Sequence, residues 1–171
     1  SVLTGTLASK LKDHARLSAR SAFRTQVLFD TDRLLQKAKS NDDILSVTCM
    51  QLSRLLDRSI VAYTKSENGM STGRLFAEKK YTYSENLLND AEQKAAEWAF
   101  QNGRRTGATT AQFGKSECLY LAIRAGDRVY GVIGIPMRPE KPDSFENSIV
   151  LSVVNECALA MDNTHNAAEK E

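Results

Sequence analysis

Cysteine is scarce in this sequence, and the three that occur lie far apart. Cys49, Cys118 and Cys157 match none of the Cys-x-x-Cys spacings that zinc ribbons and thioredoxin-like redox sites require. An odd, scattered set of cysteines is typical of a reducing compartment, where disulfides do not persist. We therefore expect no metal site, and we expect Cys118 and Cys157 to behave as small buried hydrophobic side chains.

Long apolar runs and nucleotide-binding motifs are missing as well. No run of about 18 apolar residues occurs, so no segment is predicted to cross a bilayer, and there is no signal-peptide pattern. The sequence also lacks Gly-x-x-x-x-Gly-Lys-Ser/Thr and Gly-x-Gly-x-x-Gly. Lys and Arg number 23 against 21 Asp and Glu, and the net charge of +2 is too small to indicate nucleic acid as a partner. We expect a chain of cytoplasmic character that binds no cofactor.

The composition that remains is that of an ordinary globular protein. The 171 residues are 42% hydrophobic and 26% charged, which suffices for one domain with a core of its own. The sequence begins at Ser1 without an initiator Met, so we expect it to be a piece of a longer protein.

A long helix is predicted at the start of the chain. Residues 3–39 contain no Pro, and Gly5 is their only Gly. At about 1.5 Å per residue this helix extends roughly 45 to 55 Å, more than the width of such a domain, so part of it must project. The Lys and Arg residues along it also fit a segment that leaves the cytoplasmic face of a membrane.

The same helix carries a stripe of small and apolar residues at alternating spacings of four and three, as in a parallel coiled coil. The stripe consists of Ala8, Leu11, Ala15, Ser18, Ala22, Thr25 and Phe29. It predicts a homodimer through the flanking helices. The alternative is a solvated, charged helix that docks on its own domain.

The rest of the chain predicts three more helices and two hairpins. Ser40 is the N-cap of an amphipathic helix, and Asn89 forms a capping-box pattern with Glu92. The helices are expected at 41–57, 90–102 and about 143–170, and the strands at 59–65, 75–76, 117–124 and 128–136.

This order of elements favours an α+β fold, with helices packed on an antiparallel sheet, over a parallel, doubly wound sheet. We expect residues 1–39 to be a juxtamembrane signalling helix. Residues 40–171 are expected to be a domain that ends in an exit helix.

Candidate ligand contacts are few, and no catalytic set is recognisable. His14 and His165 lie in exposed-looking helical surroundings without a neighbouring nucleophile and carboxylate, so we expect no catalytic residue. Trp98 is either core or the wall of a pocket, and residues 105–110 are either a ligand-contacting segment or an ordinary surface loop. The candidate pocket residues are Tyr63, Trp98, Arg105, Thr109, Thr110, Cys118 and Tyr120.

Several stretches of the sequence resemble the GAF domain of KdpD-type potassium-responsive sensor histidine kinases. Trp98, the paired Gly103 and Gly107 and a Leu-Tyr-Leu strand carry the resemblance. Residues 3–29 look like the segment that follows the last transmembrane helix of those kinases. The matching stretches are 96–110 (AEWAFQNGRRTGATT), 119–124 (LYLAIR) and 131–135 (GVIGI).

The resemblance implies a domain of a membrane-anchored homodimeric kinase that responds to potassium limitation and turgor. Such a kinase phosphorylates a response regulator that controls a potassium-uptake ATPase. The family's phosphoacceptor box is absent around His14 and His165, so the resemblance implies that phosphotransfer and ATP binding belong to a kinase domain beyond Glu171. The fragment itself would be non-catalytic, would lie at the cytoplasmic face of the bacterial membrane, and would meet the membrane only through transmembrane helices outside this sequence.

Two other functions stay open. Some GAF proteins are similar to free methionine sulfoxide reductases, which work through cysteines, although the three cysteines here are not clustered as expected. A ligand-free spacer that only dimerises is the other possibility. The sequence contains neither the Asn-Lys-Phe-Asp-Glu signature of cyclic-nucleotide-binding GAF domains nor a convincing bilin-attachment cysteine.

Overall fold

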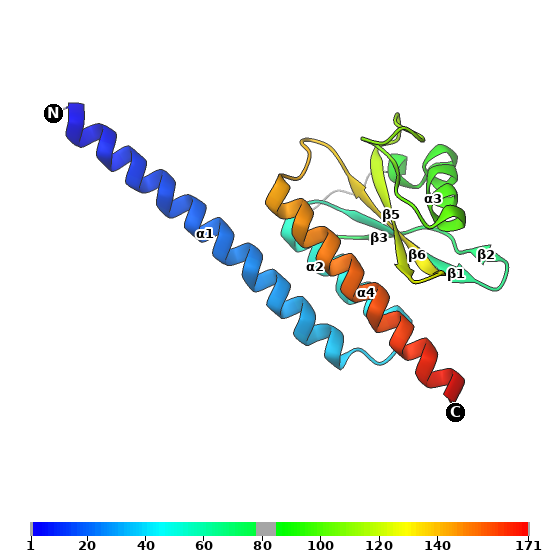
Figure 1. Ribbon diagram of the computed structural model, residues 1–171. Helices are drawn as coiled ribbons and strands as arrows, with labels where there is room; N and C mark the ends of the chain where they lie inside the picture. Colours follow the sequence, from blue (N-terminus) through cyan, green and yellow to red (C-terminus); the bar gives the residue numbers. More distant parts are fainter. Residues whose placement is uncertain (1, 78–84, 171) are drawn as a thin grey trace.

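The computed structural model describes residues 2–77 and 85–170, in which four α-helices surround an antiparallel sheet (Figure 1). The helices are α1 (Val2–Lys37), α2 (Asn41–Leu56), α3 (Asp90–Asn102) and α4 (Ser144–Lys170), and a short 3₁₀ helix, Glu85–Leu88, precedes α3. The strands are β1 (Ile60–Ser66), β2 (Gly69–Met70), β3 (Arg74–Phe76), β4 (Thr106–Gly107), β5 (Cys118–Ala125) and β6 (Arg128–Pro136).

The sheet has the strand order β2-β1-β6-β5-β4, and β3 also pairs with β1. All of its pairs are antiparallel. The long strands β5 and β6 form a hairpin, and β1 joins the free edge of β6, with Tyr63 opposite Val132. Strands β1 and β5 therefore flank β6, and residues far apart in the sequence meet on each face of the sheet.

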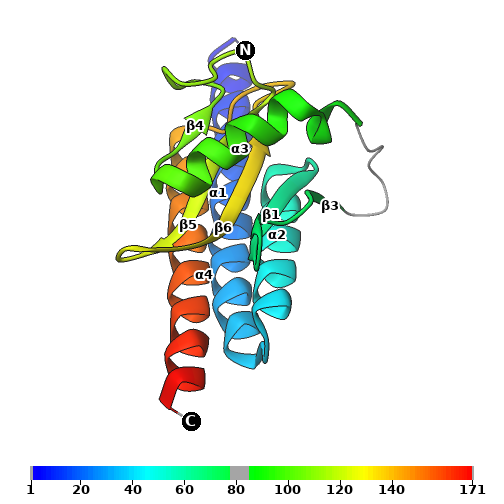
Figure 2. The same cartoon turned by 90° about the vertical axis from the view of Figure 1, so that its right-hand side faces the viewer.

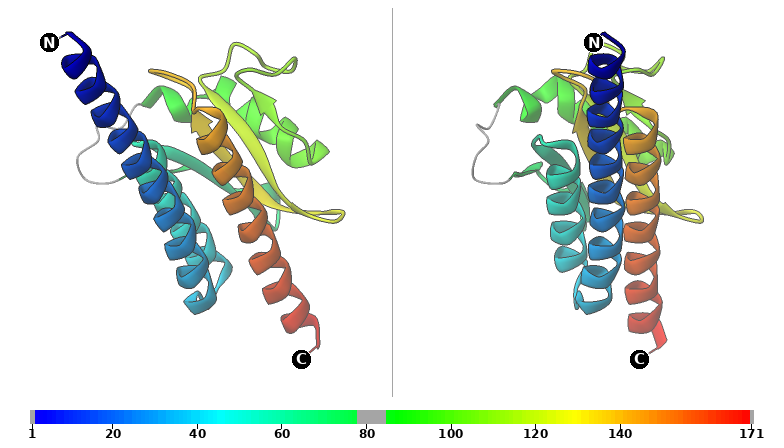
Figure 3. Two further views of the ribbon diagram at one scale, coloured as in Figure 1. Left: turned by 60° about the vertical axis from the view of Figure 1, so that its left-hand side comes forward. Right: turned by 90° about the vertical axis from the view of Figure 1, so that its left-hand side faces the viewer.

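Helices cover both faces of this sheet. Helix α3 packs on one face, whereas α2 and α4 pack on the other (Figure 2). Helix α1 lies over α2 and α4 on the side away from the sheet, and it runs in the same direction as α4 (Figure 3). Within residues 2–77 and 85–170, the α4 side is thus a layer of three α-helices, and the α3 side has one α-helix and the short 3₁₀ helix.

The strands are apolar on both faces because they are covered on both faces. Along β1, Ile60 and Ala62 join the core beneath α2 and α4, while the alternate residues Val61 and Tyr63 join a smaller core beneath α3. Successive side chains of a strand point to opposite faces, so one strand supplies both cores.

Capping residues begin and end the helices at the positions that the sequence indicates. Ser40 caps α2 by accepting a hydrogen bond from the backbone N–H of Asp43, and Asn89 caps α3 in the same way through Glu92. Gly103 ends α3 in the left-handed conformation, with φ of 63°, a geometry that glycine adopts without steric cost.

Helix α1 has two unlike halves. Its second half contributes Val27 and Leu35 to the core against α2 and α4, and both side chains are buried. Its first half projects beyond the rest of the molecule (Figure 1). Among the described residues, no helix combines the length and apolar character that crossing a membrane requires.

The predicted helices and the four predicted strands are confirmed within a few residues at their ends. The short strands β2 and β4 and the 3₁₀ helix were not predicted. The alternative of an ordinary surface loop at 105–110 is wrong for Thr106–Gly107, which form β4, and Thr106 is fully buried. The division of the chain at residue 39 stays a prediction, although α1 shares its core with α2 and α4.

Candidate functional site

The core beneath α3 brings together three of the predicted pocket residues. Tyr63 comes from β1, and Cys118 and Tyr120 come from β5. All three side chains are at most 1% exposed, and the two tyrosine rings meet edge to face with their centroids 6.5 Å apart. Ala95, Ala96 and Ala99 of α3 close this cluster from above. Small residues on α3 let the helix approach the sheet closely over the rings.

A buried carboxylate ties α3 to the start of β5. Glu92, only 3% exposed, accepts hydrogen bonds from the backbone N–H of Glu117 at 3.1 Å and of Cys118 at 3.2 Å. Its Oε1 also accepts a hydrogen bond from the hydroxyl of Tyr120 at 2.7 Å. A buried carboxylate needs such donors, because without them its desolvation is not offset. Glu92 therefore holds Tyr120 in one orientation.

A glycine makes room for that tyrosine ring. Gly134 of β6 lies opposite Tyr120, and a Cβ atom there would come within 2.6 Å of the ring carbon Cε1. The ring therefore occupies the space above β6 that a side chain at position 134 would fill. This face of the sheet is packed with the protein's own aromatic groups.

The hydroxyl of Tyr63 is the unpaired polar group in this cluster. It is buried and has no hydrogen-bond partner among the described residues. Burial, together with the nearby Cys118 and Glu92, raises the pKa of Tyr63 to about 12. An unsatisfied buried hydroxyl is unfavourable, so the hydroxyl of Tyr63 adds no stability to this core, in contrast to that of Tyr120.

The other predicted pocket residues do not join the cluster. Arg105 is exposed and lines a cavity on the opposite face of the sheet with Leu121 and Leu151. Thr109 is exposed, whereas the hydroxyl of Thr110 bonds to the carbonyl oxygens of Gly107 and Gln112 within its own loop. Only part of the predicted set is therefore brought together.

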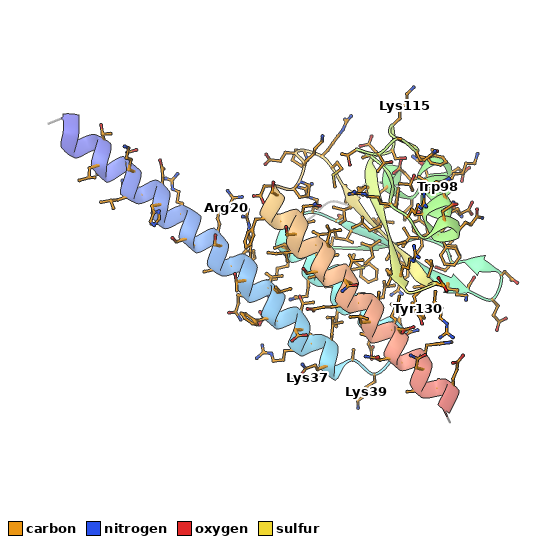
Figure 4. The ribbon with its side chains drawn as sticks, in the orientation of Figure 1. Arg20, Lys37, Lys39, Trp98, Lys115 and Tyr130 are labelled. Atoms are coloured by element: carbon orange, nitrogen blue, oxygen red, sulfur yellow. The ribbon has the colours of Figure 1, made fainter. Side chains whose placement is uncertain are left out.

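Trp98 belongs to neither apolar cluster. It is half-buried on α3 (Figure 4), so it is not a fully buried core residue. Its neighbour Phe100 packs against the cluster beneath α3 instead.

Sequence reasoning missed Glu92 as a site residue. The pattern Asn89 to Glu92 predicts a capping box, and Asn89 does cap α3. The carboxylate of Glu92 reaches β5, some 25 residues away along the chain, and no local pattern indicates that contact.

All three cysteines are free and fully buried, which confirms the prediction for Cys118 and Cys157. Burial raises the pKa of the Cys118 thiol to about 12, with a further contribution from Glu92, and raises that of Cys157 to about 11. Cys118 lies in the core beneath α3, whereas Cys49 and Cys157 lie in the core on the other face. The sheet therefore separates Cys118 from the other two thiols.

Two further cavities lie where α1 meets the body of the domain. One of about 510 Å³ is lined by charged side chains of both signs, including Arg24, Arg58 and Asp143. The other, of about 360 Å³, lies between α1 and α4 and contains Glu156. Burial, and secondarily Asp32, raises the pKa of Glu156. Within residues 2–77 and 85–170, no group of three or more His, Cys, Asp or Glu side chains is arranged to hold a metal ion.

Comparisons with known proteins identify the fold. No model of a known protein family matches the chain. The chain is 29% identical over 175 residues to the sensor protein KdpD of Clostridium acetobutylicum, a match that covers 99% of the chain and 19% of that protein. The chain thus spans about a fifth of the length of this curated relative.

Solved structures agree. The native GAF domain of the potassium sensor histidine kinase KdpD from Escherichia coli superposes with a TM-score of 0.63 at 19% identity, covering 85% of this chain and 98% of that one. The GAF domain of a phosphoenolpyruvate-protein phosphotransferase from Acinetobacter gives a TM-score of 0.58 at 13% identity, covering 84% and 95%. The chain has the GAF fold and resembles the GAF domain of KdpD sensor kinases, which confirms the prediction from residues 96–110, 119–124 and 131–135.

The two tyrosines beneath α3 should respond differently to loss of the hydroxyl. Tyr120→Phe removes a donor from the buried Glu92 and should lower the free energy of unfolding by about 1.5 to 3 kcal/mol. Tyr63→Phe removes an unpaired hydroxyl and should change it by less than about 0.5 kcal/mol or raise it. Urea unfolding of both variants measures the difference. Equal losses would contradict the assigned roles of the two hydroxyls.

The thiols should be inert in the folded protein. A disulfide reagent such as Ellman's reagent, applied at about pH 8, should modify no cysteine in the native chain and all of them in guanidinium chloride, because the thiolate form is disfavoured by burial. Ser9→Cys, at an exposed position of α1, is the positive control and should react at once. Rapid modification of native Cys118 would contradict its burial.

Proposed function

We propose that this GAF domain is a non-catalytic regulatory part of a membrane-bound, KdpD-like sensor histidine kinase that controls potassium uptake. In this proposal it transmits a signal from α1 to α4 by rearrangement of helices in a homodimer. The observation that carries the proposal is the stripe on α1, which stays exposed along its whole length in the single chain.

The stripe lies on the side of α1 opposite to the core. Val27, Thr31 and Leu35 are buried and face the body of the domain. At about 100° per residue, the stripe residues fall about 120° to 180° away from the centre of that buried face. In the single chain Leu11 is 64% exposed and Phe29 is 65% exposed. A continuous stripe with such exposed apolar side chains is typical of an interaction surface. A second copy of the helix covers such a stripe.

The projecting half of α1 also needs support. It makes no core contact among the described side chains before Arg24, and an isolated helix of about 20 residues is marginally stable in water. Pairing with the same helix of a second copy supplies the missing contacts. Each α1 then runs alongside α4 in the same direction, so the N-terminus of α1 and the C-terminus of α4 lie at opposite ends of the molecule (Figure 3).

The ligand state of the domain is a separate point. Tyr63 and Tyr120 fill the sheet face beneath α3, which supports a domain that dimerises and relays without a cofactor. ATP would be bound by a kinase domain outside this chain, and a response regulator would be the phosphotransfer partner of the whole protein. Attachment to the cytoplasmic face of the membrane would come from helices outside this chain.

A cysteine-dependent reductase gains no support from the geometry. Its chemistry needs accessible thiolates, whereas Cys118 and Cys157 are fully buried and lie on opposite faces of the sheet.

Cysteine scanning of α1 tests the homodimer. Ala15→Cys, Ser18→Cys and Ala22→Cys lie on the stripe and should form intermolecular disulfides under mild oxidation. Arg16→Cys and Arg20→Cys are exposed positions off the stripe and should cross-link weakly. Because the native thiols are buried, each variant offers one accessible cysteine. Equal yields at all five positions would remove the support for a parallel helix pair.

Native mass spectrometry gives a second test. The chain should be a dimer, and removal of residues 1–20 should leave a folded monomer, because the deleted part makes no core contact among the described side chains. A dimer that survives the deletion would move the interface to another surface. A reproducible extra mass on the chain would contradict the ligand-free proposal and indicate a sensory pocket.

A further inference from the structure

We propose that Arg24 is an ionic latch that joins the projecting half of α1 to the first turn of α4. The latch holds α1 at one angle to the domain, and its release frees the projecting half to move. Its role in signalling rests on the proposed function, whereas its existence can be tested in this chain alone.

The contacts of Arg24 span the first and last helices. Its Nη2 lies 2.6 Å from Oδ2 of Asp143 and 3.6 Å from Oε1 of Glu146. The guanidinium also lies over the ring of Phe145, 5.3 Å from its centroid. The Arg24 side chain is only 11% exposed, so its charge has lost most of its hydration and depends on these partners.

The acidic partners are also the helix cap of α4. Oδ1 of Asp143 accepts a hydrogen bond from the backbone N–H of Glu146 at 2.8 Å, and the backbone N–H of Asp143 donates to Oε1 of Glu146 at 3.1 Å. The hydrogen bond from the Glu146 backbone, and next the Arg24 guanidinium, lower the pKa of Asp143. A movement of Arg24 therefore acts directly on the cap of the exit helix.

Arg24 lies at the boundary between the two halves of α1. It is the first buried side chain along the helix among those described, and the apolar contacts of Val27 and Leu35 begin after it. Arg20, one turn earlier and 62% exposed, faces the same acidic group, with its Nη2 3.9 Å from Oδ2 of Asp143 (Figure 4). Arg20 is thus a second cation beside the same carboxylate.

The surroundings leave space for movement. Arg24, Asp143 and Glu146 line the cavity of about 510 Å³ between α1, α2 and the segment before α4. On the far wall of this cavity, Arg58 is already held by the carbonyl oxygens of Pro136 and Glu140. The Asp143 side chain is 48% exposed, so salt and water reach the latch from this side.

The angle of α1 can be measured with two spin labels. Ser9→Cys lies on the projecting half and Ser152→Cys on α4, and both positions are exposed. Double electron–electron resonance on labelled chain diluted with excess unlabelled chain reports the distance within one molecule, whatever the oligomeric state. The buried native thiols stay unlabelled. The unaltered latch should give one narrow distance distribution.

Two variants open the latch, and one serves as a control. Asp143→Asn removes the negative charge but keeps a side-chain oxygen that can cap α4. This variant therefore tests loss of the ion pair without loss of the helix cap. Arg24→Gln removes the cation. Arg33→Gln is the matched control, since Arg33 is an exposed arginine of α1 that pairs with Asp30 of the same helix.

Both latch variants should broaden the distance distribution, and about 1 M salt should broaden that of the parent chain in the same way. Salt should add little to either variant, and the control should behave like the parent. If Arg24→Gln does not fold, Asp143→Asn decides alone. A distribution unchanged by Asp143→Asn, or broadened equally by the control, would overturn the latch. Neither result bears on whether the chain dimerises.

Discussion

The structure depends on a sheet whose two faces are both apolar and must both be covered. Strand β1 supplies Ile60 to one core and Val61 to the other, and β5 does the same with Leu119 and Cys118. Such a sheet cannot leave either face in water. The two coverings differ, however, because three helices lie on one side and a single short helix on the other.

The two cores also differ in the kinds of side chain that fill them. The core on the α4 side is mainly aliphatic and contains the thiols of Cys49 and Cys157, while Gln51 of α2 donates a hydrogen bond to Thr31 of α1. The α3 side holds Tyr63, Tyr120 and Glu92, and here hydrogen bonds as well as packing determine the arrangement. Glu92 accepts three hydrogen bonds, whereas the hydroxyl of Tyr63 has no hydrogen-bond partner among the described residues. The same small core therefore contains both a satisfied and an unsatisfied polar group.

The three-helix side explains how one helix can serve two purposes. From Arg24 onward α1 is part of the core, and before it the helix carries exposed Leu7 and Leu11. Apolar packing of Val27 and Leu35 fixes the position of α1, whereas the charged contacts of Arg24 reach the beginning of α4. Burial and charge therefore act at adjacent turns, and this is the region where a regulatory domain would connect input and output.

Much of the fold could be predicted from the sequence alone. The helices and the long strands follow from periodicity and from caps such as Ser40 and Gly103, which depend only on neighbouring residues. The resemblance to KdpD-type GAF domains also lay in the sequence, in the motif around Trp98.

By contrast, β4 is two residues long and exists because β5 lies beside it. Arg105 directly precedes this strand and Tyr120 pairs with it, yet the two lie on opposite faces of the sheet. The contacts of Glu92 with Tyr120 and of Arg24 with Asp143 join segments separated by 28 and 119 residues. Only the packing of helices on the sheet decides such pairs, because no local pattern carries information about a partner so far along the chain.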